Sequence, residues 1–342
     1  MWLLISKLKM FETIRYLIGV NGPSGYSSKS TAEQVTEEVP DLCSITAIVT
    51  GATSGIGEET ARVLVKRGAR VVIPVRDLKA GEDVKARLSS EFPESEVIVM
   101  SIDLSSLKSV RRFVAEFESH GLPLNLLINN AGKFAQRHAI SEDGIEINFA
   151  ANYLGHFLLT KLLLSKMMTT AKDSGIQGRI VNVSSNIHGW FSGDIIGYLG
   201  EISRKNCDYD ATRAYALSKL ANVLHTKELS RRLKQMEANV TANAVHPGVA
   251  RTRLTRERVD IATVFLLASV LLKTIPQAAA TTCYVATHRK LMNVSGKYFS
   301  DCNEALTSKM GCSLEEAAKL WAASERLVSG DPVTLLNKVC CE

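Results

Sequence analysis

The chain has 342 residues, of which 46% are hydrophobic and 22% are charged, so it is predicted to be globular, neither disordered nor embedded in a membrane. Its net charge of +6 is mild and its basic residues are scattered, which weakly favours an anionic cofactor or a membrane surface and gives no case for nucleic acid. The seven cysteines are odd in number and lack metal-ligand spacing, so we expect reduced thiols, an intracellular protein and no bound metal.

Residues 1–43 are expected to form an N-terminal extension. Its first twenty residues are apolar but interrupted by charges, and no signal-peptide cleavage pattern follows, which argues against a spanning helix. Five apolar residues can share one helical face: Leu4, Leu8, Phe11, Ile14 and Ile18. Two interpretations stay open here, an interfacial membrane helix or a helix packed on the domain. Residues 21–30 are rich in glycine and serine and are interpreted as a linker.

From residue 44 to residue 303, apolar runs typical of strands alternate with helical patterns. The predicted strands are 45–49, 71–75, 97–100, 124–128, 179–183, 240–245 and, at an edge, 296–299. Helical patterns include 58–65, 109–118, 152–168 and 215–234. This alternation predicts an α/β protein with a Rossmann-type, doubly wound parallel sheet in a single domain with terminal extensions. Residues 304–342 are expected to form a C-terminal helix and tail.

A second apolar run, at residues 261–272, is too short to span a bilayer, which needs ~20 residues. It is predicted to be a buried helix or, alternatively, an apolar lid over a substrate cleft, because short apolar runs are ambiguous.

A glycine-rich turn, Thr50-Gly51-Ala52-Thr53-Ser54-Gly55-Ile56-Gly57, lies between the first predicted strand and the first predicted helix. In such a turn Gly51 permits tight reversal, Gly55 lets the backbone approach a pyrophosphate, and Gly57 lets helix and strand pack closely. The helix N-terminus then faces the phosphates. A glycine cluster alone is as compatible with an ordinary loop as with a cofactor site.

Further polar motifs follow the later strands. Asp103-Leu104 follows the third, where the carboxylate can accept a hydrogen bond from an adenine amino group, and Asn129-Asn130-Ala131-Gly132 follows the fourth. Ser184-Ser185 follows the fifth. Parallel strands bring their carboxyl ends to one edge of the sheet, where this architecture places its ligand crevice, so we expect these motifs to meet there.

Tyr215 and Lys219 are four residues apart and share one face of a helix. A free tyrosine has a pKa of ~10 and is a poor acid–base catalyst at neutral pH, but a lysine ammonium one turn away stabilises the phenolate. Ser185 can donate a hydrogen bond to a carbonyl oxygen that gains charge during hydride transfer. Alone, such a pair is usually a solvated helix face, and only the other motifs give it meaning.

Together these motifs resemble the short-chain dehydrogenase/reductase family over residues 44–300. The resemblance implies that Tyr215 is the general acid/base, that Lys219 also binds the nicotinamide ribose, and that Ser185 polarises the carbonyl. It implies that Asn152 holds a proton-relay water through a helix kink, and that Pro247-Gly248 with Thr252 contacts the nicotinamide carboxamide. The remaining cofactor contacts it implies are Thr50, Gly51, Ser54, Gly55, Ile56, Gly57, Asp103, Leu104, Asn130, Ala131 and Gly132.

The cofactor is predicted to be NADP(H). An NAD enzyme places an acid at the end of the second strand, whereas here Val75 is followed by Arg76, a cation for a 2′-phosphate. Arg76 can alternatively be a surface partner of Asp77. Ser54 departs from the pattern, since many NADP-using relatives carry a basic residue in the glycine turn.

Within the family, Asn152-Tyr-Leu-Gly-His-Phe-Leu-Leu-Thr160 and Arg179-Ile-Val-Asn-Val-Ser-Ser185 resemble the retinol-dehydrogenase-like branch. The closest similarity is to plant translocon-associated short-chain dehydrogenases of the chloroplast inner envelope, through Gly22–Glu33, Gly121–Ile128 and Pro276–Ala286. This resemblance implies a plant protein on the stromal side of the envelope, with the cytoplasm as the alternative. Lys133, where an apolar residue is usual, and the long N-terminal segment depart from the pattern.

The expected function is therefore NADP(H)-dependent interconversion of an alcohol and a carbonyl on a small apolar substrate. Trp190-Phe191 and the 261–272 run suggest the apolar character, although both aromatics can equally be core. The alternative is an NADP(H)-binding redox sensor in an envelope protein-import complex. The expected partners are the small substrate and either a membrane surface or an envelope translocon. A homodimer can also form, through the helices at 152–168 and 215–234.

Overall fold

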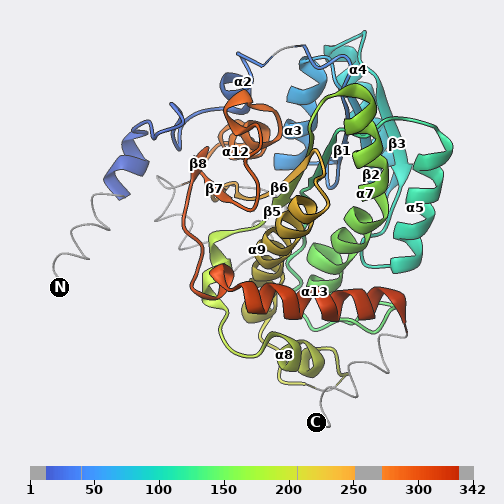
Figure 1. The fold of residues 1–342 in the computed structure, drawn as a ribbon, viewed down its shortest axis with the longest axis vertical. Helices are drawn as coiled ribbons and strands as arrows, with labels where there is room; N and C mark the ends of the chain where they lie inside the picture. Colours follow the sequence, from blue (N-terminus) through green and yellow to red (C-terminus); the bar gives the residue numbers. More distant parts are fainter. Residues whose placement is uncertain (1–12, 40, 206, 251–271, 331–342) are drawn as a thin grey trace.

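A single sheet organises the computed structural model, which describes residues 13–39, 41–205, 207–250 and 272–330. Within these residues the sheet has eight strands in the order β3-β2-β1-β4-β5-β6-β7-β8 (Figure 1). The strands are β1 Thr46–Val49, β2 Arg70–Val75, β3 Val97–Ser101, β4 Leu126–Asn129, β5 Gly178–Val183, β6 Val240–His246, β7 Tyr298–Ser300 and β8 Asn303–Glu304. All neighbours from β3 to β7 pair in parallel, which confirms the predicted doubly wound α/β sheet.

Helices cover both faces of this sheet (Figure 1). One face carries α3 Gly55–Lys66, α4 Leu78–Glu91 and α12 Ile275–Thr287, with the short α2 Ala32–Val35 against α12 and α3. The other carries α5 Leu107–Ser119, α7 Gly155–Ser174 and α9 Ala211–Gln235, with α13 Leu314–Ser329 packed on α9. The shorter elements are α6 Ile147–Phe149, the π-helical turn η1 Ala150–Leu154, α8 Ile195–Ile202, and the 3-10 turns η2 Asn186–Trp190, η4 Arg289–Leu291 and η5 Met310–Cys312.

The strands are apolar throughout because successive side chains enter different cores. In β1, Ile48 joins the core beneath α5, α7 and α9, whereas Ala47 and Val49 join the core beneath α3 and α12. In β4, Leu127 joins the core beneath α5, α7 and α9, and Leu126 joins the core beneath α3 and α12. A strand buried on both faces cannot alternate apolar and polar residues, so it appears in the sequence as a continuous apolar run.

The predicted edge strand at 296–299 corresponds to β7, and its assignment to the edge is wrong. The antiparallel β8 pairs outside it, through Phe299 with Glu304 and Ser300 with Asn303. The chain reverses at Asp301 and Cys302, which both have positive φ, of 52° and 62°. A two-residue strand after an abrupt turn leaves no periodic signal in a sequence.

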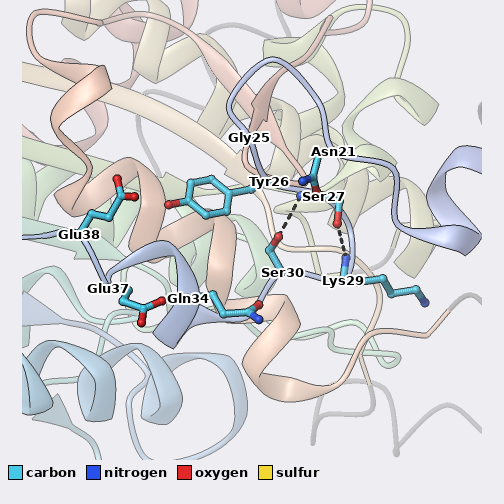
Figure 2. Close-up of a pocket in the computed structure, with 9 residues that line it drawn as sticks. All are labelled: Asn21, Gly25, Tyr26, Ser27, Lys29, Ser30, Gln34, Glu37 and Glu38. Atoms are coloured by element: carbon cyan, nitrogen blue, oxygen red, sulfur yellow. Dashed lines mark hydrogen bonds between the residues drawn. The ribbon is translucent and has the colours of Figure 1, made fainter.

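The interpretation of residues 21–30 as a linker is also wrong, because this stretch is part of the folded body. Ser24, Ser27 and Ser28 are buried. The Ser24 amide donates to Asn303 Oδ1 (2.9 Å), and Lys290 Nζ donates to the Ser24 carbonyl (3.1 Å). The segment, α2 and the turn after α2 line an open pocket (Figure 2). Its volume is about 440 Å³. The side chains of Asn303 and Lys290 thus satisfy the backbone of Ser24 and hold the segment on the folded body.

The described residues include no helix with the length and apolar character needed to cross a membrane. Residues 1–12 and the 261–271 part of the second apolar run lie outside the described residues. The prediction of a buried helix or lid therefore rests on the sequence alone, and of the expected N-terminal helix the structure describes only the stretch 13–18.

Candidate active site

The candidate site residues gather at the carboxyl edge of the sheet, around the ends of the paired strands β1 and β4. From β1 the chain runs outward to β3 on one side, and from β4 it runs outward to β7 on the other. Such a change of direction opens a crevice at the strand ends, which is where ligands bind in open α/β sheets.

The glycine turn is shaped by backbone contacts that leave no room for side chains. Gly51 has a φ of +69°, and a Cβ there would lie 2.7 Å from the Ala131 Cα. A Cβ at Gly57 would lie 2.3 Å from the Gly51 carbonyl oxygen. Ser54 precedes α3 without a side-chain hydrogen bond to the helix, so the first-turn amides are not capped by it. A turn this tight, ending at such a helix N-terminus, fits the pyrophosphate of a dinucleotide.

Thr50 and Asn130, both predicted to contact cofactor, have side chains that join the two loops. The Thr50 hydroxyl oxygen accepts hydrogen bonds from the amides of Asn130 and Ala131 (both 2.9 Å). Asn130 Nδ2 donates to the Thr50 carbonyl (2.8 Å), and Thr50 is fully buried. These side chains therefore set the distance between the glycine turn and the loop after β4.

The rim beyond β2 and β3 carries the residues expected near the adenosine. Arg76 is exposed and forms no ion pair with any residue in the described ranges. The Asp77 carboxylate instead caps α4, accepting from the amides of Lys79 and Ala80 (3.0 and 3.3 Å). The Asp103 carboxylate accepts from the Ser105 amide (2.9 Å) and hydroxyl (2.7 Å), while Leu104 is buried. The alternative role of Arg76 as a partner of Asp77 is thus wrong.

Helix α9 brings Tyr215 and Lys219 against the end of β5. Lys219 Nζ lies 5.6 Å from the centre of the Tyr215 ring and donates to the Val183 carbonyl (3.1 Å). Ser184 Oγ donates to the Lys219 carbonyl (2.7 Å), which fixes the strand end to the helix. The next residue, Ser185, is half-buried, and its hydroxyl accepts from the Ile187 amide (3.4 Å). The serine, tyrosine and lysine predicted from separate motifs therefore belong to one site.

Burial makes Lys219 an unusual lysine. It is 3% exposed, and the loss of solvation lowers its pKa to about 8. Its ammonium lies close to the loop after β4, since a Cβ on Gly132 would be 3.3 Å from Nζ. Gly132 thus leaves room for the ammonium of Lys219.

Asn152 lies in η1, the π-helical turn between α6 and α7, where the family resemblance implies a helix kink. It is fully buried. Its side chain clamps the backbone of Lys133, accepting from the amide (2.7 Å) and donating to the carbonyl (2.9 Å), and donates also to Ser218 Oγ (3.0 Å). Lys133 takes part through backbone atoms, so this contact does not require an apolar residue there.

The loop after β6 begins at the same carboxyl edge of the sheet. Pro247 is buried, and Gly248 has a φ of +90°, with a Cβ position only 2.5 Å from Lys273 Cδ. Lys273 is itself buried and pairs with Asp301 (2.6 Å). Thr252, predicted to contact the carboxamide, lies outside the described residues.

Four residues near the site were missed from the sequence. Phe134 packs edge-on to Tyr215, with ring centres 5.1 Å apart. Ser218 and Asn222 extend the face of α9 that carries Tyr215 and Lys219, and their spacing along the helix could have indicated them. His156 contacts Thr50 Oγ1 (2.9 Å) from α7, and no local pattern signals a contact across 106 positions.

A glycine turn at the switch point of a doubly wound sheet, facing a serine, a tyrosine and a buried lysine, is the arrangement of a dinucleotide-dependent oxidoreductase. Comparison with known proteins agrees, because the family model for short chain dehydrogenases matches residues 45–198. The chain belongs to the short-chain dehydrogenase/reductase family of oxidoreductases.

Relatives extend this similarity over nearly the whole chain. Short-chain dehydrogenase TIC 32 B, chloroplastic, from Brassica napus is 47% identical and aligns over 94% of this chain and 100% of its own. Retinol dehydrogenase 12 from Bos taurus is 40% identical over 82% of this chain and 85% of its own. Among solved structures, an uncharacterised protein from Mycobacterium paratuberculosis has a TM-score of 0.68 at 31% identity, covering 89% of this chain and 98% of that one.

Proposed function

We propose that this protein is an NADP(H)-dependent oxidoreductase that interconverts an alcohol and a carbonyl group on a small apolar substrate. The observation that carries the proposal is the placement of buried Lys219 beside Tyr215 at the strand end that carries Ser185. A structural lysine gains nothing from losing solvation in this way, whereas a catalytic tyrosine gains a cation that stabilises its phenolate.

The proton chemistry follows from the side chains. When bound, the nicotinamide supplies the hydride to the carbonyl carbon or accepts it from the alcohol carbon. In reduction the Tyr215 hydroxyl gives its proton to the carbonyl oxygen, and the Ser185 hydroxyl donates a hydrogen bond to that oxygen. In oxidation the Tyr215 phenolate takes the proton back. Lys219, charged below its pKa of about 8, favours the phenolate in both directions.

The preference for NADP(H) over NAD(H) is supported by the end of β2. Arg76 is exposed there and makes no ion pair among the described residues, so its guanidinium can bind a 2′-phosphate. The neighbouring carboxylate of Asp77 is used by the N-terminus of α4 and does not neutralise it.

The apolar character of the substrate is supported by Trp190, which is 73% exposed on η2, the turn that begins directly after Ser185. Phe191 is 2% exposed and belongs to the core, so the proposal does not include it as a substrate contact.

A chloroplast location is supported by the similarity to the two Brassica napus relatives, which are named as chloroplastic. Peripheral contact with the envelope is supported by Ile14 and Ile18, which are 46% and 69% exposed in the helical stretch 13–18. A translocon role remains the alternative function, in which the same nucleotide site senses redox state. The predicted homodimer would form through α7 and α9. Part of the surface of α9 is already covered within the chain, because Trp321 of α13 packs on it.

The test is NADPH oxidation by the purified full-length protein with a panel of apolar aldehydes and ketones, repeated with NADH and with Tyr215→Phe. Turnover that prefers NADPH and is lost in Tyr215→Phe supports the enzyme. Tight NADPH binding without turnover by any member of the panel favours the sensor. Failure to bind either nucleotide overturns both functions.

A further inference from the structure

A fully buried histidine joins the nucleotide-binding turn to the catalytic helix. His156 lies on α7, one turn after Asn152, and makes one contact with each ring nitrogen. Nε2 is 2.9 Å from Thr50 Oγ1, at the start of the glycine turn, and Nδ1 is 3.1 Å from the Asn152 carbonyl oxygen in the π-helical turn. Neither contact involves an exposed group, since Thr50 and Asn152 are fully buried and His156 is 3% exposed.

The hydrogen bonds of the Thr50 hydroxyl determine the tautomer of this histidine. Thr50 Oγ1 accepts from two backbone amides, those of Asn130 and Ala131, which occupies both of its lone pairs. Its hydrogen must therefore be donated, and His156 Nε2 at 2.9 Å is a closer acceptor than the Ile128 carbonyl at 3.3 Å. Nε2 consequently carries no hydrogen, and Nδ1 carries the one that is donated to the Asn152 carbonyl.

The neutral state of the ring is consistent with its surroundings. Burial lowers the pKa of His156 to about 4, and the charge of Lys219 acts in the same direction. The other titratable group facing it is His225 of α9, whose pKa is lowered to about 3 by burial. The ring is thus uncharged at neutral pH, which agrees with an Nε2 atom that accepts a hydrogen bond from Thr50.

From Asn152 the hydrogen bonds continue to the catalytic lysine. Asn222 Nδ2, on α9, donates to the Asn152 carbonyl (3.2 Å) and lies 3.3 Å from the Val183 carbonyl. The Val183 carbonyl is the same atom that accepts from Lys219 Nζ (3.1 Å). Thr50, His156, Asn152, Asn222 and Lys219 therefore form one continuous polar path across the molecule's interior.

We propose that His156, as the neutral Nδ1–H tautomer, is a positioning residue that couples the nucleotide-binding turn to the Asn152 and Lys219 end of the site. Its two hydrogen bonds hold Thr50 and the Asn152 carbonyl at a fixed separation, so that the nucleotide turn and the catalytic cation keep their mutual geometry. The kinetic part of this inference rests on the proposed function, and the tautomer does not.

The chain offers variants that separate the two hydrogen bonds. His156→Asn can retain a donor near Nδ1, His156→Gln can retain an acceptor near Nε2, and His156→Leu retains neither. His225→Leu is the matched control, because His225 is equally buried but neither of its ring nitrogens has a hydrogen-bond partner among the described residues.

With a carbonyl substrate that the wild type reduces, His156→Leu is expected to lower kcat by about tenfold or more, since misplacement of reacting groups by ~1 Å can cost ~100-fold. KM for the carbonyl should change by less than about threefold, and His156→Asn and His156→Gln should each recover part of kcat. His225→Leu should alter the melting temperature and leave kcat per folded molecule unchanged. The kinetic coupling is overturned if His156→Leu lowers kcat no more than the control does.

The second readout needs no turnover. Two-bond proton–nitrogen NMR spectra of protein labelled with ¹⁵N-histidine report which ring nitrogen carries the hydrogen, and the His156 signals are assigned by their loss in His156→Leu. We expect an Nδ1–H tautomer whose signals move on saturation with NADPH. An Nε2–H tautomer, a charged ring at pH 7, or signals that NADPH leaves in place would overturn the proposal. If the protein binds no nucleotide at all, the proposed function fails separately, and the tautomer still decides whether the path exists.

Discussion

The two halves of helix α9 each have a buried face, yet they are held in different ways. The first half makes hydrogen bonds to backbone carbonyls through Lys219 and Asn222. The second half packs against the aromatic ring of Trp321 from α13. The Trp321 and His225 rings stack with their centres 5.4 Å apart, and Arg232 Cζ lies 4.4 Å from the centre of the Trp321 ring. Directional bonds fix where an atom lies, whereas buried apolar area contributes free energy with little directional demand. The hydrogen bonds that position the site residues thus lie in the first half, and the aromatic packing on α13 lies in the second, which also accepts a hydrogen bond at Thr226 from Asn182 (2.8 Å).

The largest effect is expected from Lys219→Met, which keeps the length of the side chain and removes its charge. Under the proposed function, turnover should fall by about 100- to 10,000-fold, since the variant lacks the cation proposed to stabilise the Tyr215 phenolate. The apo protein should nevertheless become more stable at pH 7 by about 2–3 kcal/mol, because burial of the charge lowers the lysine pKa from 10.5 to about 8.

The pH dependence of that gain has a definite sign. Below pH 8 the lysine is charged in both the folded and the unfolded wild type, so the cost of burying it is fully present. Between pH 8 and 10.5 the unfolded state holds more protons, so the wild type gains stability as pH rises and the advantage of Lys219→Met disappears. Denaturant unfolding of both proteins from pH 7 to 10.5 measures this, and a constant difference would contradict it.

Trp321→Ala should lower the free energy of unfolding by about 3–5 kcal/mol, since it leaves a large cavity between α9 and α13. The kcat of the molecules that remain folded should stay within about twofold, because the first half of α9 keeps its hydrogen bonds. Urea unfolding and active-site-normalised kinetics provide the two numbers. A large fall in kcat would show that the two halves are not separable, whereas Trp321→Phe should give a smaller loss of stability.

Arg76→Glu tests the end of β2. The exposed side chain of Arg76 makes no ion pair with the described residues there and is expected to bind the 2′-phosphate alone. NADPH affinity should weaken by about 10- to 100-fold, corresponding to the ~1.5–3 kcal/mol of a hydrogen bond to a charged group. NADH affinity should change by less than about threefold. Titration of both nucleotides gives the answer, with Arg112→Glu, an exposed position on α5, as the control for net charge. Equal weakening by both variants would remove Arg76 from the nucleotide site.

The smallest effect is expected for Lys161→Ala, which removes the ion pair between α7 and Glu325 of α13 (2.9 Å). Both side chains are about 40% exposed, so the pair should contribute ~0.2–1 kcal/mol. Urea unfolding beside Trp321→Ala compares them directly. A loss as large as that of the tryptophan variant would mean that charge, and not aromatic packing, holds α13 in place.

The central sheet was predictable because each buried strand leaves an apolar run with polar or glycine residues at its end. The parallel strands were located to within two residues, from Ile45 to Val245. Short elements fixed by turns, such as β8 after Asp301 and Cys302, were not predictable, because positive φ at two non-glycine residues has no sequence signature. The same holds for residues 21–30, whose composition suits both a linker and a set of tight, buried turns.

The candidate site was predictable where its residues are adjacent in sequence or one helical turn apart, as in Tyr215 and Lys219. It was not predictable where the contact joins distant elements. Thr50 was expected to face the cofactor, but its hydroxyl is used by two amides and a histidine from α7. His156 was visible only as one residue of a family motif, since its role depends on how α7 packs against β1.

The N-terminal segment also constrains the order in which the chain can fold during its synthesis. Ser24 is held by Lys290 and Asn303, and Tyr26 packs edge-on to Tyr284, with ring centres 5.6 Å apart. These partners leave the ribosome more than two hundred residues later than the segment they hold. Ser24 and Tyr26 therefore lack these contacts until the last strands of the sheet have been made, whereas Glu33 can already pair with Arg62 and Lys66 of α3.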